Sequence, residues 1–312
     1  MDNARTNQNA HHRDAPRLHA ISRAKALLAA LRPRQWVKNL LVLAPILFAQ
    51  SLFDAEAVAR GLLAFVLFCL VSSGGYLVND IRDLEQDRLH PLKQKRPLAA
   101  ATLRVSTAIL AAAVLLLAGV AGAFALGGAF ALAVAAYCVV NLAYTFALKH
   151  VVIVDVFAIA AGFVLRAVAG ALAIRVVMSN WLLVCTTLLA LFLGFSKRRY
   201  ELLLLKEDAG HHRQVLEEYS PLFLDMMIGI VTASTVMSYT LYTISDETHQ
   251  RFHTRGLLLT VPFVLYGIFR YLYLVYHRDG GGDPTETFFT DGATMVNLLL
   301  WTASVVLVLY WR

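Results

Sequence analysis

The chain has 312 residues, of which 58% are hydrophobic and only 16% are charged, and its formal net charge is +7. Soluble domains carry about 25% charged residues, so this composition excludes an ordinary soluble protein and indicates a polytopic membrane protein. The three cysteines lie inside apolar runs, at no spacing typical of a disulfide or a metal site. No nucleic-acid motif occurs, so we attribute the positive charge to membrane topology and expect no nucleic-acid partner.

The N-terminal region is polar and differs in composition from the rest of the chain. Residues 1–19 have no apolar stretch, so we expect a disordered tail and no cleavable signal peptide. Residues 20–35 place apolar side chains on one helical face and basic ones on another, which predicts an amphipathic helix in the membrane interface. Residues 36–312 should form a single transmembrane domain that carries the functional site.

Apolar segments long enough to cross a bilayer, about 20 residues each, follow one another along this domain. Nine are expected, near residues 37–53, 60–79, 105–125, 128–147, 152–174, 181–196, 224–244, 256–276 and 293–311. The first is short and interrupted by Pro45, and the sixth is also short, so the count holds to within one. The fold class expected is an all-α membrane bundle.

Lys and Arg residues are unevenly distributed among the loops. They gather before the first span, between the second and third, and after the sixth. Because cytoplasmic loops carry the excess of Lys and Arg, we expect a multi-pass protein of the plasma membrane with a cytoplasmic N-terminus and a cytoplasmic functional site. The acidic, glycine-rich loop at residues 277–291 fits this rule poorly and is expected to be a flexible cytoplasmic connector.

A run of acidic residues at the end of the second span is the most informative motif. On a helix, Asn79, Asp83 and Asp87 fall at i, i+4 and i+8, and Asp80 leans to the same side. Carboxylates on one face repel one another unless a cation sits among them, and Mg²⁺ prefers such hard oxygen ligands together with substrate phosphates. The alternative is a solvated acidic helix end. Basic residues just downstream favour a magnesium–phosphate site instead.

Polar residues inside other apolar segments are further candidates because burying them in a membrane is costly. Tyr144 belongs to a polar stripe, which interhelical hydrogen bonding would also explain. Arg166 lies deep in its segment and must face either a cavity or an acidic partner. The cluster after the sixth span, which includes Lys197 and Arg198, could be an ordinary positively charged flank.

The acidic run resembles the first aspartate-rich motif of the UbiA superfamily of intramembrane prenyltransferases. Within that superfamily the chain is most similar to the branch that transfers phosphoribosyl to decaprenyl phosphate, through residues 32–39, 79–97, 148–155, 162–170 and 196–201. The superfamily's second Asp-x-x-x-Asp motif is missing after the sixth span, where Lys197 to Glu201 stand instead. Tyr144 and Lys149 are also five residues apart rather than the family's four. Both departures argue against a prenyl diphosphate donor.

The resemblance implies a UbiA-like bundle around a cytoplasm-facing cavity. It implies transfer of phosphoribosyl from phosphoribosyl pyrophosphate to a polyprenyl phosphate, giving a lipid-linked pentose precursor for cell-envelope glycan such as arabinan. The implied Mg²⁺ ligands, which also form the catalytic group, are Asp80, Asp83 and Asp87, with Asn79 in support. The implied phosphate-binding residues are Arg34, Lys38, Lys95, Arg96, Lys149, Arg166, Lys197 and Arg198. Substrate-orienting roles are implied for Asn79, Tyr144, Asp155 and Glu201.

Two other functions stay open at this point. One is a UbiA-type prenyltransferase that uses a prenyl diphosphate donor. The other is a transporter or lipid flippase, which the polar intramembrane residues would suit. However, the charge concentrates at one membrane face, whereas transporters place their sites near the midplane between paired repeats. Any exposed helix face could face lipid or another copy of the chain, so a homo-oligomer is possible.

Overall fold

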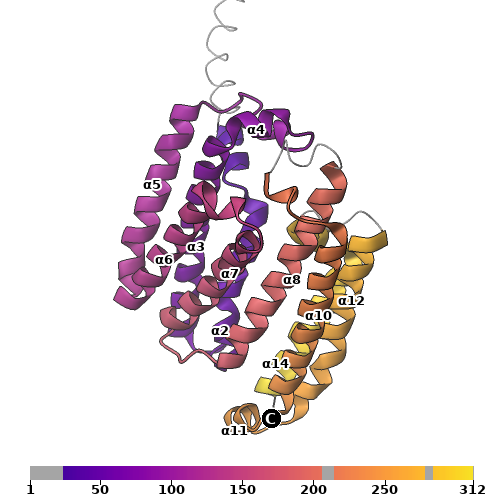
Figure 1. The fold of residues 1–312 in the computed structure, drawn as a ribbon. Helices are drawn as coiled ribbons and strands as arrows, with labels where there is room; N and C mark the ends of the chain where they lie inside the picture. The colour runs from indigo at the N-terminus through magenta and orange to yellow at the C-terminus, as the bar shows by residue number, and fades with distance from the viewer. Residues whose placement is uncertain (1–23, 206–213, 278–283, 312) are drawn as a thin grey trace, which may run out of the picture.

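The computed structural model describes residues 24–205, 214–277 and 284–311, and these residues form a bundle of helices (Figure 1). The long helices are α3 (Ala55–Arg82), α5 (Val105–Ala123), α6 (Gly128–Phe146), α7 (Val154–Ala173), α8 (Asn180–Leu205), α10 (Pro221–Ile244), α12 (Val261–His277) and α14 (Gly292–Tyr310). Shorter elements join them, namely the 3₁₀ helices η1 (Pro33–Leu43), η2 (Lys93–Lys95), η3 (Phe124–Leu126), η4 (Leu148–His150), η6 (Gln214–Leu216) and η7 (Gly256–Thr260), and the α-helices α2 (Ala44–Phe48), α4 (Leu84–Leu89), α11 (Asp246–Phe252) and α13 (Pro284–Thr290).

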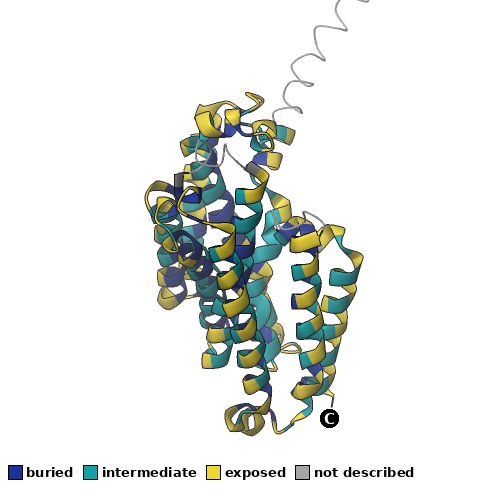
Figure 2. Ribbon diagram, turned by 45° about the vertical axis from the view of Figure 1, so that its right-hand side comes forward, coloured by how far each residue is buried: buried dark blue, intermediate teal, exposed yellow. Residues whose placement is uncertain are grey.

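Eight of the helices in the described ranges are long and apolar enough to cross a membrane. The chain is therefore a multi-pass membrane protein, as predicted. The sixth predicted span is longer than expected, because α8 has 26 residues and continues through the basic cluster without a break. The helix outer surfaces in Figure 2 are largely exposed, and many of the exposed side chains are leucine, valine or phenylalanine, as a lipid-facing surface requires.

The first predicted span has an unusual form. Residues 33–48 form η1 and α2, which pack between α3 and α7 and lead from the end of the bundle at α4 to the opposite end (Figure 1). A 3₁₀ helix rises about 2.0 Å per residue, so the eleven residues of η1 and the five of α2 together cover roughly 30 Å. That is the thickness of the hydrocarbon core. The predicted count of about nine spans is confirmed, with this segment as the first.

The long helices form two groups on either side of a central space. Helices α3, α5 and α6 pack with α7 around one apolar core, and α8, α10 and α12 pack with α7 around a second. A further cluster joins α10 and α14 at the end of the bundle near α11. Helix α7 contacts both groups and η1, so its side chains reach the centre of the molecule.

The N-terminal segment only partly matches its predicted limits. Residues 24–30 are helical, but Arg32 takes a left-handed backbone conformation (φ 55°) and ends that helix before η1 begins at Pro33. Ala30 is buried against Leu77 and Leu98, so the short helix packs on the bundle. The predicted tail at residues 1–19 lies outside the described residues.

The predicted flexible connector at residues 277–291 is partly structured. Helix α13 occupies Pro284–Thr290, and the Thr285 hydroxyl hydrogen-bonds to the Gln35 side chain in η1 (3.3 Å). Asp291 then caps α14 and pairs with Arg270 of α12 (2.6 Å). The prediction of a wholly flexible loop was therefore wrong for residues 284–291, because α13 packs on η1. Residues 278–283 lie outside the described ranges.

Gly170 allows α7 to approach η1 closely. A Cβ atom at this position would collide with the backbone carbonyl of Val42. We expect Gly170→Ala to destabilise the bundle by about 1–3 kcal/mol, because backbone cannot move aside as a flexible side chain does. Thermal unfolding in detergent measures this, with Gly229→Ala as the control because a methyl group at Gly229 would meet no atom within 4 Å. Equal unfolding temperatures for the two variants would contradict the close packing.

Candidate functional site

A cavity of about 1570 Å³ occupies the space between the two helix groups. Its wall near η2 and η4 is polar and carries acidic and basic side chains. Further along, the wall becomes apolar and is formed by residues such as Leu47, Phe48, Leu193 and Trp301. One cavity therefore offers both a charged compartment and an apolar one.

The acidic run lies at the junction of α3 and α4. Helix α3 ends at Arg82 and α4 begins at Leu84, with Asp83 between them, so the predicted continuous helix is interrupted here. The backbone N–H groups of Asp83 and Asp87 still bond to the carbonyls four residues earlier (2.9 and 2.8 Å). This keeps the predicted spacing, and Asn79 donates its side-chain amide to Asp83 (3.1 Å).

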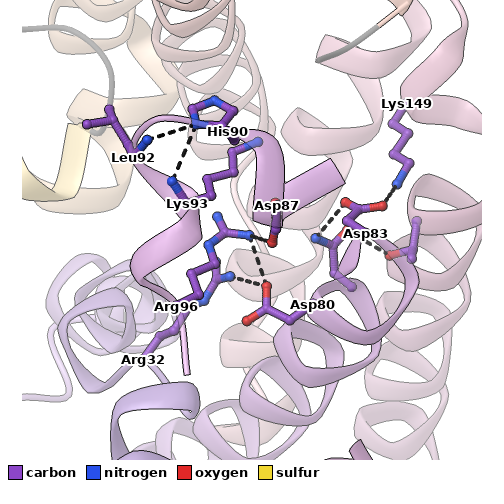
Figure 3. A network of polar contacts seen from close by, with 11 residues as sticks. Arg32, Asp80, Asp83, Asp87, His90, Leu92, Lys93, Arg96 and Lys149 are labelled. Carbon is purple, nitrogen blue, oxygen red and sulfur yellow. Dashed lines mark hydrogen bonds and ion pairs between the residues drawn. The ribbon is translucent and has the colours of Figure 1, made fainter. Parts of the chain in front are cut away.

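Each carboxylate of the run is paired with a cation from another part of the chain (Figure 3). Arg96 donates from Nη1 to Oδ1 of Asp80 (3.0 Å) and to Oδ2 of Asp87 (2.6 Å). Arg32 pairs with the same Asp80 oxygen. We call these four residues the arginine–aspartate cluster. Burial lowers the pKa of Arg32, and the neighbouring Asp80 opposes that shift.

Asp83 has its own partner on the opposite side. Lys149, in η4, pairs with Asp83 Oδ1 and is itself buried. Figure 3 shows Lys149 reaching Asp83 from a different direction than the two arginines that approach Asp80. Three carboxylates are therefore balanced by three cations at the polar end of the cavity.

The donor atoms of the run suit a hard divalent cation. They are all oxygens, and Oδ2 of the buried Asp80 has no hydrogen-bond partner. In the described ranges, the His, Cys, Asp and Glu side chains form no group of three arranged as a metal site. The carboxylates instead point at the cations. The residue types fit a magnesium ion, and the ion pairs would have to open for the three to share one.

Most of the predicted site residues line the cavity. They are Lys38, Asn79, Asp83, Asp87, Arg96, Tyr144, Lys149, Arg166, Lys197 and Glu201. The structure does not bring Arg34, Asp80, Lys95, Asp155 or Arg198 to the wall. Arg34 and Lys95 are exposed outside it, and Asp80 lies directly behind the wall, where Arg32 and Arg96 hold it.

Sequence reasoning missed three Lys and Arg residues of the described wall, namely Arg32, Arg82 and Lys93. Arg32 and Lys93 line the cavity, each two positions before a residue that the sequence had favoured, Arg34 and Lys95. For Arg32 a signal was available, because it precedes a proline, as the predicted Arg96 does. A residue before proline is disfavoured in the right-handed helical conformation. Its side chain can therefore point in a different direction from those of the adjoining helix.

Arg198 is fully buried in a second ionic network behind the cavity. Its Nε contacts Asp155 Oδ2 (2.5 Å), its Nη1 pairs with Glu201, and its Nη2 donates to the Tyr144 hydroxyl (3.1 Å). Asp155 also accepts from the Tyr219 hydroxyl (2.8 Å), and both burial and Asp155 raise the Tyr219 pKa. All of these contacts are internal, so Arg198 and Asp155 hold α7, α8 and the segment before α10 together.

Arg166 has a different environment. It donates to Asn39 Oδ1 (2.8 Å), the Gly162 carbonyl (2.8 Å) and the Tyr137 hydroxyl (2.7 Å), and it stacks on the Tyr137 ring. Within the described part of the chain Arg166 makes no ion pair. Of the two environments expected for Arg166, the described residues therefore support the cavity and not an acidic partner. Its guanidinium lies at the cavity wall with no carboxylate of the described ranges paired to it.

The Arg198–Asp155 pair gives a stability prediction. Removing one partner of a buried pair costs about 3–5 kcal/mol, whereas replacing both by apolar residues is often neutral. We expect Asp155→Leu to lower the unfolding temperature in detergent strongly. Asp155→Leu with Arg198→Met should recover only part of the loss, because Glu201 and Tyr144 then lose their contacts with Arg198. A double variant no more stable than the single one would show that the pair is not balanced as described.

Comparison with known proteins agrees with this architecture. The model of the UbiA prenyltransferase family matches residues 40–292. The chain is 36% identical to decaprenyl-phosphate phosphoribosyltransferase of Corynebacterium glutamicum, over 92% of this chain and 87% of that protein. It is 34% identical to the protein of the same name from Mycolicibacterium smegmatis, over 91% and 92% of the two chains.

A solved structure shares the fold. A UbiA homologue from Archaeoglobus fulgidus, bound to DMAPP and Mg²⁺, superposes with a TM-score of 0.68 at 20% identity, covering 92% of this chain and 99% of that one. Throughout the ranges that the structure describes, the protein is thus a helical membrane protein with this fold. It belongs to the UbiA prenyltransferase family.

Proposed function

We propose that this protein transfers a phosphoribosyl group from phosphoribosyl pyrophosphate to a polyprenyl phosphate, releasing pyrophosphate. The observation that carries the proposal is the cavity itself, in which a compartment with acidic and basic side chains continues into an apolar one. A diphosphate-bearing sugar fits the first, and a lipid chain fits the second. The names of the relatives from Corynebacterium and Mycolicibacterium support the same reaction.

The reaction forms a bond between a phosphate oxygen of the lipid and C1 of the ribose. The bond from C1 to the pyrophosphate oxygen breaks, and pyrophosphate leaves with that electron pair. The transition state has oxocarbenium character, as in other glycosyl transfers. The lipid phosphate is already ionised, so no general base is needed, and the apolar surroundings of the cavity limit competing attack by water.

The basic residues of the cavity wall would bind the phosphates of both substrates. Arg32 and Arg96 contact Asp80 of the acidic run, and Lys149 contacts Asp83. Lys93 and Lys197 also line the cavity wall. Arg166 lies deeper and carries the unbalanced charge described above. Glu201 and Tyr144 also line the wall and would orient the ribose or the neighbouring cations.

A divalent cation completes the proposed site, and we propose Mg²⁺. Structures of UbiA homologues from Archaeoglobus fulgidus contain Mg²⁺ or Cd²⁺. Asp80, Asp83 and Asp87 would hold the ion, with Asn79 in support. When bound, such an ion neutralises the charge that develops on the departing pyrophosphate.

We further propose that the polar end of the cavity faces the cytoplasm and that the protein resides in the plasma membrane. The described basic loops gather at this end, which the rule for cytoplasmic positive charge favours. The product would be a lipid-linked pentose for a cell-envelope glycan. The apolar part of the cavity would receive the polyprenyl chain next to its phosphate.

The direct test is a transfer assay with purified protein in detergent. We expect label from phosphoribosyl pyrophosphate to appear in the organic phase only when polyprenyl phosphate and Mg²⁺ are both present, and to disappear with EDTA. Asp83→Asn should lower the rate by at least about 100-fold without unfolding the protein, because it removes both a metal ligand and the partner of Lys149. Transfer from a labelled prenyl diphosphate instead would establish the alternative prenyltransferase function.

Lys93 and Lys95 form a matched pair for testing the cavity wall. Lys93 lines the cavity, whereas Lys95 is exposed outside it. We expect Lys93→Ala to raise the KM for phosphoribosyl pyrophosphate about tenfold, the effect of losing one charge-assisted hydrogen bond. Lys95→Ala should change that KM by less than about twofold, since exposed charges are screened. The reverse order would place the substrate on the other side of η2.

A further inference from the structure

Two arginines occupy one oxygen of Asp80 and one of Asp87, two of the three carboxylates proposed to hold a divalent cation. Arg96 Nη1 contacts both Asp80 Oδ1 and Asp87 Oδ2, and Arg32 contacts the same Asp80 oxygen. A metal ion and a guanidinium compete for these carboxylates, because both are attracted by the same negative charge and repel each other when close together. The pairing seen in Figure 3 therefore competes with metal binding.

The charge balance makes this competition strong. The side chains of Asp80 and Asp87 are only 2% and 4% exposed. Removing the counter-ion of either carboxylate without replacing it would therefore be strongly unfavourable, because water cannot solvate the buried charge. The remaining Asp80 oxygen, Oδ2, is buried and has no hydrogen-bond partner. Asp80 therefore has one oxygen paired with arginine and one without a partner in the described ranges. Such a carboxylate can exchange the arginines for a metal ion that engages both oxygens.

The arginines can make that exchange. Their side chains are 23% and 25% exposed, and both also line the cavity. Both residues have a non-helical backbone conformation and directly precede a proline. Arg32 has φ 55°, and Arg96 is extended. A left-handed conformation is uncommon for a residue with a side chain.

We propose that Arg32 and Arg96 are exchangeable counter-ions, which hold Asp80 and Asp87 until a diphosphate group takes their guanidiniums and so frees the carboxylates for the divalent cation. Guanidinium binds phosphate in the same forked geometry that it uses for carboxylate, so the arginines lose little on transfer. Metal and diphosphate then bind with positive coupling. This rests on the proposed function only in that the donor carries a diphosphate.

Binding of Mn²⁺ to the full-length protein in detergent tests the proposal without any turnover. Equilibrium dialysis with and without inorganic pyrophosphate measures the ion on the protein side. We expect wild-type protein to bind Mn²⁺ about tenfold more tightly when pyrophosphate is present. We expect Arg96→Gln to bind Mn²⁺ alone about tenfold more tightly than wild type, because the charge-assisted bonds to Asp80 and Asp87 no longer compete. The variant should also gain less from pyrophosphate.

Three further variants make the result specific. Arg32→Gln should shift Mn²⁺ binding in the same direction as Arg96→Gln, and it keeps the test decisive if the latter does not fold. Arg88→Gln removes the same charge from α4 but from an arginine that pairs only with the exposed Glu85, and it should leave Mn²⁺ binding unchanged. Asp87→Asn should weaken Mn²⁺ binding, which places the ion at the acidic run.

Several outcomes would overturn the proposal. One is that folded Arg96→Gln and Arg32→Gln bind Mn²⁺ no more tightly than wild type. Another is that Arg88→Gln increases the affinity for Mn²⁺ as much as the other two variants do. The increase would then come from the general loss of positive charge rather than from exchange of these ion pairs. Unchanged binding by Asp87→Asn would place the ion elsewhere. A failed transfer assay with the expected Mn²⁺ results would remove the proposed reaction and leave the exchange intact.

Discussion

Charge neutralisation inside an apolar bundle is the constraint on which the site depends. Burying an isolated carboxylate or guanidinium in a membrane protein costs several kcal/mol, so such groups persist only with partners. Here three carboxylates of the α3–α4 junction meet three cations from the N-terminal break, the η2 turn and η4. These pairings fix segments that lie far apart in the sequence around one end of the cavity. The same pairings set which atoms a metal and a phosphate can reach.

The other buried arginines show how differently one residue type can be used. Arg198 is enclosed by Asp155, Glu201 and Tyr144 and joins helices rather than facing the cavity. Among the residues that the structure describes, Arg166 has neutral partners only, and it faces the cavity. An arginine whose charge is already balanced contributes to structure, whereas one without an anion favours an anionic ligand. This contrast separates positioning residues from binding residues at a site where the sequence alone does not distinguish them.

The sequence predicted the fold class and the location of the site because both follow from local composition. Apolar length predicts spans, and an acidic run at a span end followed by basic residues predicts a metal and phosphate site. Side-chain direction was harder to predict. Lys197 and Arg198 are adjacent on a helix and therefore point about 100° apart, and only the packing of α8 decides which one reaches the cavity. The choice of Arg32 over Arg34 depends on the backbone break at Arg32, which the following proline favours but which charge and apolar length do not indicate. Likewise, apolar length alone did not predict the 3₁₀ form of the first span, which packs closely on α7.

The exchange of ion pairs links these observations to catalysis, and an experimental structure with Mg²⁺ and pyrophosphate tests it most directly. Arg32 and Arg96 should be found on phosphate oxygens, with Asp80, Asp83 and Asp87 turned toward the metal and the backbone of α3 and α4 unmoved. Pyrophosphate and metal bound elsewhere in the cavity, with both arginines still paired to Asp80, would contradict the mechanism.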